Sequence, residues 1–333
     1  MIPHSSQKAQ KSTWQSLLKR SIVDPVQLLN FVEIDPCLVD WINPHFKLKV
    51  PLGFAKKIVK GCLEDPILKQ ILPLSKENIV SENYDIDPLK ERSQNPLPGL
   101  IHKFKSRVLV MPATRCPIHC RYCFRRHFPY DNNNINLKQF AAIGNYIEAD
   151  PNINEIVLSG GDPLYASDHY LHLIIKQLTR SNQIKIIRFH SRFPITMPER
   201  IDSSFIDMLA QIPQKIVLVV HCNHPQELCE EIRQAVIRLK QANVTVLNQG
   251  VILKGINDDV STLKTLSYRL FECGIMPYYM NQLDLVSGSA HFEVEKSTLL
   301  SLQRALLAEL PGYLVPKFVQ EQPFTASKVP LIE

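Results

Sequence analysis

Three cysteines stand close together with the spacing Cys-x3-Cys-x2-Cys. Cys116, Cys120 and Cys123 offer three thiolates from one short loop, and no fourth cysteine lies beside them. A 4Fe-4S cluster held by three thiolates keeps one iron open for another ligand, whereas structural zinc normally fills all four positions with protein groups. The spacing therefore predicts an iron-sulfur cluster with an open iron. A Cys3His zinc site that uses His119 or His127 is the alternative.

The composition is that of an ordinary globular protein. The chain has 333 residues, of which 45% are hydrophobic and 21% charged, enough to bury a large core. No apolar run reaches the ~18 residues of a membrane span, and the polar first residues do not resemble a secretory signal. The remaining cysteines are scattered singly, which fits a reducing compartment. The formal charge of +6 comes without a long basic block. We therefore expect a cytoplasmic protein with no membrane or nucleic-acid partner.

Apolar runs alternate with segments of helical period from about residue 108 onward, which is typical of βα units around a parallel sheet. The pattern predicts strands at 107–112, 155–159, 184–190, 215–221, 244–252 and 275–281, and helices at 137–149, 168–179, 203–211, 225–242, 260–272 and 295–310. Such units form an incomplete barrel, whose chemistry gathers at the C-terminal ends of the strands. Because the cysteine loop follows the first strand, we expect it at the mouth.

The first hundred residues lack this alternation. They carry helical runs, such as 26–32 and 51–62, broken by Asp-Pro pairs at 24–25, 35–36, 65–66 and 87–88. We therefore predict a helical N-terminal domain at 1–100, the barrel at 101–310 and a C-terminal segment at 311–333.

Polar residues mark the ends of several predicted strands. Ser159 is followed by Gly160, Gly161, Asp162 and Pro163, where glycines allow close backbone approach and the carboxylate can bind an ammonium group. A simple strand-to-helix turn explains the same residues.

Two further side chains are predicted at the mouth. His221 ends the fourth strand, and Gln249 lies in the fifth. His221 and His224 are equally compatible with a role in capping the helix that follows.

Taken together, these motifs resemble those of radical S-adenosylmethionine (SAM) enzymes and, among them, the lysine 2,3-aminomutase family, which also uses pyridoxal phosphate (PLP). The resemblance extends from about residue 20 to the end. It rests on Pro98–Lys103, Cys120–Tyr130, Ser159–Leu164, His190–Pro194, Met276–Met280, Ala290–Phe292 and Gly312–Lys317. Within the family, the sequence is most similar to the short bacterial form that supplies (R)-β-lysine for modifying a lysine of elongation factor P.

The resemblance implies an α/β fold, a partial (βα)6 TIM-like radical SAM barrel with a helical N-terminal domain and a C-terminal PLP-binding segment. It implies cluster ligation by the three cysteines. The SAM contacts that it implies are Tyr122, Ser159, Asp162, His221 and Gln249.

The resemblance also implies a PLP site and a substrate site. Lys328 matches the PLP lysine, although a lysine so near the C-terminus would otherwise be read as a solvated surface charge. The implied phosphate ligands are Lys103 and Arg107, with Arg192 as a weaker third, and the implied substrate ligands are Arg125 for the carboxylate and Asp284 and Glu321 for the ε-ammonium group. The chain departs from the family at Lys103, at Glu321 and in the loop 322–327, which is not rich in glycine.

The implied reaction converts L-α-lysine into (R)-β-lysine with an electron from an external donor. It implies a functional link to the ligase that modifies elongation factor P and leaves a homo-oligomer open. Another radical SAM enzyme, a zinc-binding interaction protein and an aminomutase for glutamate or arginine are the alternatives. Lys328 with Arg125 favours a PLP aminomutase, and the acids Asp284 and Glu321 favour a cationic substrate.

Overall fold

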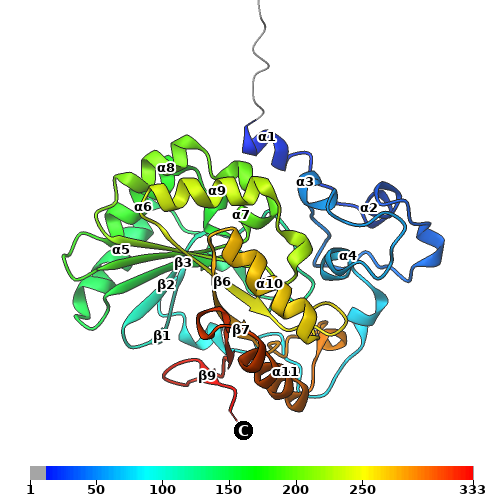
Figure 1. Cartoon of the computed structure of the whole chain (residues 1–333). Coiled ribbons are helices and arrows are strands. Elements are labelled where there is room, and N and C mark those ends of the chain that lie inside the picture. The colour runs from blue at the N-terminus through cyan, green and yellow to red at the C-terminus, as the bar shows by residue number, and fades with distance from the viewer. Residues whose placement is uncertain (1–12, 333) are drawn as a thin grey trace, which may run out of the picture.

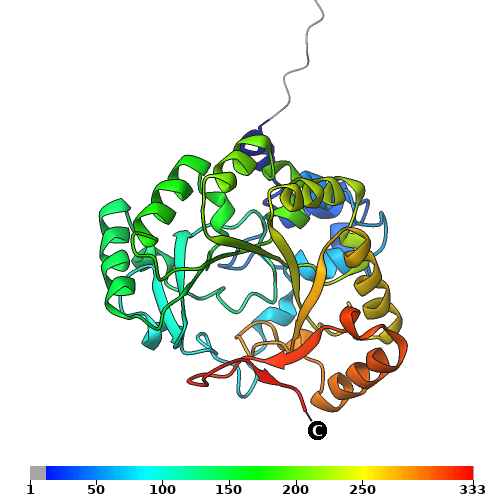
Figure 2. The same ribbon diagram turned by 60° about the vertical axis from the view of Figure 1, so that its left-hand side comes forward.

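The computed structural model describes residues 13–332 and contains a nine-stranded sheet whose strands follow one another in chain order. The strands are β1 Leu100–Phe104, β2 Arg107–Ala113, β3 Glu155–Gly160, β4 Ile186–Ser191, β5 Lys215–Val220, β6 Thr245–Val251, β7 Met276–Asn281, β8 Lys317–Gln320 and β9 Val329–Pro330. Strands β2 to β8 pair in parallel, whereas β1 with β2 and β8 with β9 are antiparallel. Figure 2 shows the strands curving around an interior, with the helices outside.

Helices lie outside this sheet, as in a partial barrel (Figure 1). They are α1 Trp14–Leu18, α2 Pro25–Phe31, α3 Leu52–Ala55, α4 Pro66–Ile71, α5 Leu137–Ala149, α6 Asp168–Leu178, α7 Phe193–Thr196, α8 Ser203–Ala210, α9 Glu230–Gln241, α10 Val260–Glu272 and α11 Lys296–Glu309. Figure 1 shows α1 to α4 gathered at one side of the barrel. The predicted α/β partial barrel is confirmed.

All the strands expected from the apolar runs are present, within two residues at each end. β1, β8 and β9 were not predicted, and β8 extends the parallel part of the sheet. These strands have 5, 4 and 2 residues and lack a long apolar run. Their pairing with the sheet, rather than a strong local pattern, makes them strands.

The helix predicted at 225–242 begins later, at Glu230. Pro225–Glu227 is a separate 3-10 turn. The Glu227 carboxylate turns inward and accepts hydrogen bonds from the backbone N–H groups of Asn223 and His224, each at 3.0 Å. This inward turn interrupts the helix.

Two of the Asp-Pro pairs at which the sequence predicted breaks between helical runs also start the next helix. Asp24 caps α2 and Asp65 caps α4, in each case followed by proline in the first turn. The run predicted at 51–62 forms only the short helix α3, and the chain then turns at Gly61, where φ is 71°.

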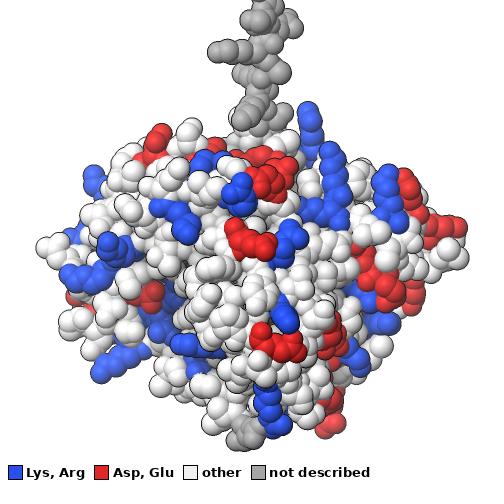
Figure 3. Space-filling view, in the orientation of Figure 1, with Lys and Arg blue, Asp and Glu red and all other residues white. Residues whose placement is uncertain are grey.

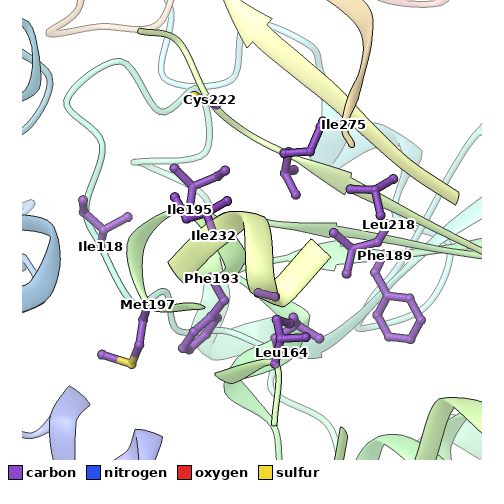
Figure 4. Close-up of a cluster of buried hydrophobic side chains, with 14 of the residues drawn as sticks. Ile118, Leu164, Phe189, Phe193, Ile195, Met197, Leu218, Cys222, Ile232 and Ile275 are labelled. Carbon is purple, nitrogen blue, oxygen red and sulfur yellow. The ribbon is translucent and has the colours of Figure 1, made fainter. Parts of the chain in front are cut away.

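One hydrophobic cluster runs through the molecule from Trp14 to Leu331. Figure 4 shows a part of it, in which Phe189 of β4 lies beside Leu218 of β5, and Ile195 of α7 lies beside Ile232 of α9. The division of the chain at residues 100 and 310 stays a prediction.

Residues 13–332 contain no helix that is both long enough and apolar enough to cross a membrane. Basic and acidic side chains of the described residues are interspersed over the face shown in Figure 3. This distribution agrees with the mild net charge of +6.

Candidate active site

A cavity of about 460 Å³ gathers every residue that the sequence predicted for the site. Its lining includes Cys116, Cys120, Cys123, Tyr122, Lys103, Arg107, Arg125, Ser159, Asp162, Arg192, His221, Gln249, Asp284, Glu321 and Lys328. These residues come from segments more than 200 positions apart in the chain. The sheet thus brings them together around one space, while the role of each stays a prediction.

The cysteine loop follows β2 and is fixed by backbone contacts. The Cys123 N–H donates to the Cys120 carbonyl at 3.1 Å. Burial raises the pKa of the Cys123 thiol to about 11, and the neighbouring Cys120 adds to the rise. Burial and nearby negative groups, the other two cysteines among them, likewise raise the pKa of Cys116. Burial thus disfavours the free thiolates, which a positively charged ligand would stabilise.

The geometry does not support the alternative zinc site. His119 Nδ1 lies 2.7 Å from the Lys47 carbonyl oxygen, and His127 Nε2 lies 3.1 Å from that of Ser287. A three-thiol loop open to a large cavity fits a cluster better than one ion.

Arg192 lies beside the cysteine loop. Its guanidinium contacts the Cys120 sulfur and also donates to Gln70 Oε1 at 2.9 Å and to Glu227 Oε2 at 3.2 Å. A cation here stabilises the negative charge of thiolates, which is a further fit to an iron-sulfur cluster.

The glycine turn after β3 packs tightly against the start of the cysteine loop. A Cβ atom on Gly161 would lie 2.7 Å from the backbone of Thr114 and of Arg115, so only glycine fits. The Asp162 carboxylate accepts hydrogen bonds from Ser191 Oγ at 2.8 Å, the Arg192 N–H at 2.7 Å and the Leu164 N–H at 3.0 Å. Burial raises its pKa to about 6 despite these bonds. Asp162 therefore fixes this turn, and its role toward SAM stays a prediction.

Tyr122 and His221 form a buried pair at the cavity wall. The Tyr122 hydroxyl lies 2.9 Å from His221 Nε2, accepts from Asn223 Nδ2 at 2.7 Å and donates to Gln70 Oε1 at 3.3 Å. Burial and the charge of Arg192 lower the pKa of His221 to about 3, so the ring is neutral at pH 7. His224, by contrast, caps the following turn by accepting from the Gln226 N–H.

Lys328 points into the cavity rather than to solvent. Its Nζ donates to Asn281 Oδ1 at 2.8 Å, lies 3.1 Å from Glu321 Oε2 and lies 5.6 Å from the centre of the Tyr279 ring. Only 16% of the side chain is exposed. The residues after Lys328 pair with β8 as strand β9, and this pairing fixes the C-terminal segment at the barrel.

Two carboxyl groups of the cavity have opposite pKa shifts. Burial would raise the pKa of Glu321, but the charges of Lys103 and Lys328 lower it to about 2. Burial and the negative charge of Glu321 raise the pKa of Asp284 to about 7. Among the described residues, the Asp284 carboxyl makes no hydrogen bond or ion pair. Asp284 is thus the acid with free capacity for a ligand.

Arg125 and Arg107 differ in their partners. Arg125 Nε and Nη2 donate to the two carboxylate oxygens of Glu91 at 2.6 and 2.8 Å, and Nη1 lies 3.4 Å from Ser159 Oγ. The Arg107 guanidinium lies 4.1 Å from the centre of the Phe104 ring, and no ion pair with another residue of 13–332 is formed.

Sequence reasoning missed several charged or polar residues of the site, among them Asn281, which accepts a hydrogen bond from Lys328. Arg188 and His190 line the cavity, and Glu91 lies behind it. His190 Nε2 is buried and has no partner among residues 13–332, and burial lowers the pKa of its ring. On β4, Arg188 and His190 alternate with the buried Ile187 and Phe189, so strand alternation could have found them.

Comparison with known proteins agrees with this geometry. Residues 110–266 match the Radical SAM superfamily. The L-lysine 2,3-aminomutase of Haemophilus influenzae is 39% identical over 96% of this chain and 96% of its own length. That of Escherichia coli is 39% identical over 96% of this chain and 95% of its own. The chain belongs to the lysine 2,3-aminomutase family.

Within this family, the Clostridium subterminale L-lysine 2,3-aminomutase is 35% identical over 80% of this chain but only 64% of its own length. A solved radical SAM methyltransferase from Sphaerobacter thermophilus is more distant, with a TM-score of 0.48 and 16% identity over 66% of this chain and 68% of its own. As a member of the lysine 2,3-aminomutase family, the protein is an isomerase whose cofactors are a 4Fe-4S cluster, SAM and PLP.

Proposed function

We propose that the protein converts L-α-lysine into (R)-β-lysine by moving the amino group to the neighbouring carbon. The observation that carries this proposal is the single cavity that holds both the three-thiol loop and the amine of Lys328. The names of the most similar relatives, L-lysine 2,3-aminomutases, support the substrate.

The cofactors divide the cavity between two sets of residues. We assign Cys116, Cys120 and Cys123 to the cluster, and the SAM contacts to Tyr122, Ser159, Asp162, His221 and Gln249. When bound, the reduced cluster with SAM supplies a radical, and PLP supplies a π-system through which an amino group can migrate. We expect the walls of the barrel to limit the access of water to the reacting groups.

Lys328 supplies the amine that reacts with the aldehyde of PLP. Its burial beside Asn281 and Tyr279 holds this amine in the cavity. We assign the PLP phosphate to Lys103, Arg107 and Arg192. Arg107 is the strongest of these candidates, because Lys103 pairs with Glu91 and Glu321, and Arg192 pairs with Glu227.

The substrate meets charges of opposite sign. We infer that Arg125 binds the α-carboxylate and that Asp284 with Glu321 receives the ε-ammonium group. Lysine carries a carboxylate for Arg125 and an ammonium group for the two acids, whereas glutamate would place a carboxylate against Asp284 and Glu321. This arrangement favours a cationic amino acid.

The product has a proposed use in the cell. We propose that β-lysine is used by the ligase that modifies elongation factor P, because the sequence resembles the short bacterial form with that role. An external donor would reduce the cluster, and the scattered single cysteines support a cytoplasmic location.

An anaerobic assay tests the proposal. The reconstituted protein is incubated with SAM, PLP, reductant and L-lysine, and chiral chromatography separates α-lysine from both enantiomers of β-lysine. We expect (R)-β-lysine only when all three additions are present. L-Arginine and L-glutamate serve as competing substrates, and conversion of either in preference to lysine would contradict the proposed specificity.

Two cysteine variants link the reaction to the loop. Cys120→Ala removes a thiol of the cavity, and Cys37→Ala removes an exposed thiol as the control. We expect loss of bound iron and of product only for Cys120→Ala. Unchanged iron content in that variant would remove the ligand assignment.

A further inference from the structure

Five side chains of alternating charge form a continuous row along the cavity. Arg125 pairs with Glu91 at 2.6 Å, Glu91 with Lys103 at 3.0 Å, Lys103 with Glu321, and Glu321 with Lys328 at 3.1 Å. All except Glu91 line the cavity. Glu91 lies behind the row and is only 1% exposed.

The backbone around Glu91 is fixed independently of this row. Asp87 Oδ1 accepts the Glu91 N–H at 2.9 Å, and Asp87 Oδ2 accepts that of Arg92 at 3.1 Å. Lys90, immediately before Glu91, has a φ of 52°, which turns the chain sharply. The Glu91 carboxylate is therefore anchored before it meets its cationic partners.

Glu91 fixes the plane of the Arg125 guanidinium. A guanidinium has five N–H groups in one plane, and the Glu91 carboxylate occupies the edge formed by Nε and Nη2. The opposite side, with Nη1, lies 3.4 Å from Ser159 Oγ at the cavity wall. The free N–H groups of Arg125 thus face the space where a ligand can lie.

Electrostatic attraction keeps both Glu91 and Arg125 charged. Burial would raise the pKa of Glu91, but Arg125 and Lys103 lower it overall. Burial would lower the pKa of Arg125, but Glu91 raises it above its usual range. Because a buried ion pair is strongly destabilised when one partner is lost, the geometry of Arg125 depends on Glu91.

We propose that Glu91 is a positioning residue, which holds Arg125 in the orientation that binds the α-carboxylate of the amino-acid substrate. This inference rests on the role given to Arg125 in the proposed function. The opposite possibility is that Glu91 only neutralises Arg125 and competes with the substrate carboxylate. The two possibilities predict opposite changes in substrate affinity. Loss of a positioning group weakens carboxylate binding, whereas loss of a competitor strengthens it.

The experiment compares two ligands that differ in the carboxylate. L-Lysine and cadaverine, its decarboxylated analogue, are titrated into the full chain loaded with cluster and PLP but without SAM. The change in PLP absorbance reports binding without turnover. For Glu91→Gln, we expect affinity for L-lysine to fall about tenfold and affinity for cadaverine to stay within about threefold.

Glu91→Asp keeps the charge but shortens the side chain by one methylene, so it guards against misfolding of the glutamine variant. Positioning predicts that it also loses lysine affinity relative to cadaverine, by about threefold or more. The matched control is Asp168→Asn, which removes the carboxylate of another ion pair, with Arg200 at 2.7 Å, away from the cavity. It should leave the lysine-to-cadaverine ratio unchanged.

The outcomes separate this inference from the proposed function. Equal losses for lysine and cadaverine in the Glu91 variants, or tighter lysine binding, would overturn the positioning role while leaving the aminomutase proposal intact. A wild-type protein that makes β-lysine yet binds both ligands equally would remove the role of Arg125 and the inference with it. Failure of the wild-type protein to bind lysine at all would count against the proposed function itself.

Discussion

At the scale of single residues, the cavity shows how neighbouring acids acquire different states. Glu321 lies between two lysines and keeps its charge. Asp284 forms no ion pair among the described residues, and burial with the charge of Glu321 outweighs the effect of Lys328 and Lys103 and raises its pKa to about 7. A carboxyl that is half protonated near neutral pH changes its charge most when a cation approaches, because the cation stabilises the ionised form. Asp284 is therefore the group whose state responds to substrate.

This difference predicts a pH dependence of lysine binding. Below pH 7 Asp284 is protonated and neutral, and above pH 7 its carboxylate attracts the ε-ammonium group, which stays charged until about pH 10. Glu321 is ionised throughout. We therefore expect kcat/KM for L-lysine to rise with pH through about 7. Asp284→Asn should remove this inflection and lower kcat/KM about tenfold. An inflection that persists in the variant would contradict the assignment.

The position of Lys328 predicts the effect of its removal on PLP binding. Because its amine lies in the cavity beside Asn281, Lys328→Ala should abolish the absorbance band of protein-bound PLP. The iron content should not change, since the cysteine loop is untouched. Lys317→Ala removes an exposed lysine of β8 and is the control. A retained band and full activity in Lys328→Ala would refute the role of this lysine.

Sequence could name these residues but not their surroundings. Lys328 follows no local pattern that indicates burial, and only pairing of β9 with β8 turns it toward Asn281. Glu91 also carries no local signal, because its partners lie 12 and 34 positions away. The alternation along β4, by contrast, was available and predicts that Arg188 and His190 share one face.

At the scale of elements, turns decide how closely the loops of the site approach one another. Gly161, directly after β3, lets the backbone pass against residues 114 and 115, next to the cysteine loop. Sequence predicted the strands around this turn because long apolar runs indicate buried strands. It missed β1, β8 and β9, because their short segments become strands only through pairing with the sheet.

Two glycine-to-alanine changes are expected to have opposite effects. In Gly161→Ala, the added methyl group would meet backbone atoms at 2.7 Å, so the fold should lose about 2 kcal/mol and the cysteine loop should bind less iron. Gly53 lies in α3 with no atom within 4 Å of such a methyl group. Gly53→Ala should therefore add about 0.5 kcal/mol by helix propensity. Urea unfolding of the apoprotein measures the free energy of unfolding of each variant. Equal changes in the two variants would contradict the argument.

At the scale of the whole molecule, the N-terminal region supports the cysteine loop. The Arg121 N–H donates to the Gln70 carbonyl at 2.9 Å, and its guanidinium pairs with Glu77. The His119 N–H donates to the Lys49 carbonyl at 3.0 Å. The region before residue 100 thus contacts the loop directly, and its stability is tied to that of the site.

This coupling predicts that the N-terminal region and the barrel unfold together. The chain has two tryptophans, Trp14 and Trp41, and both lie in the N-terminal region. Trp14 meets Phe193 of α7 with ring centres 5.7 Å apart, and Trp41 packs against the same core. Tryptophan fluorescence therefore reports the N-terminal region, while far-ultraviolet circular dichroism reports mainly the barrel.

In a urea titration of the apoprotein, the midpoints of the two signals should coincide, because one hydrophobic cluster runs from Trp14 to Leu331. Trp14→Phe, which keeps an aromatic ring against Phe193, leaves Trp41 as the only fluorophore and should give the same midpoint within error. A fluorescence transition that precedes the loss of circular dichroism would show separate unfolding. That result would favour a domain boundary near residue 100, as the sequence predicted, over the shared core.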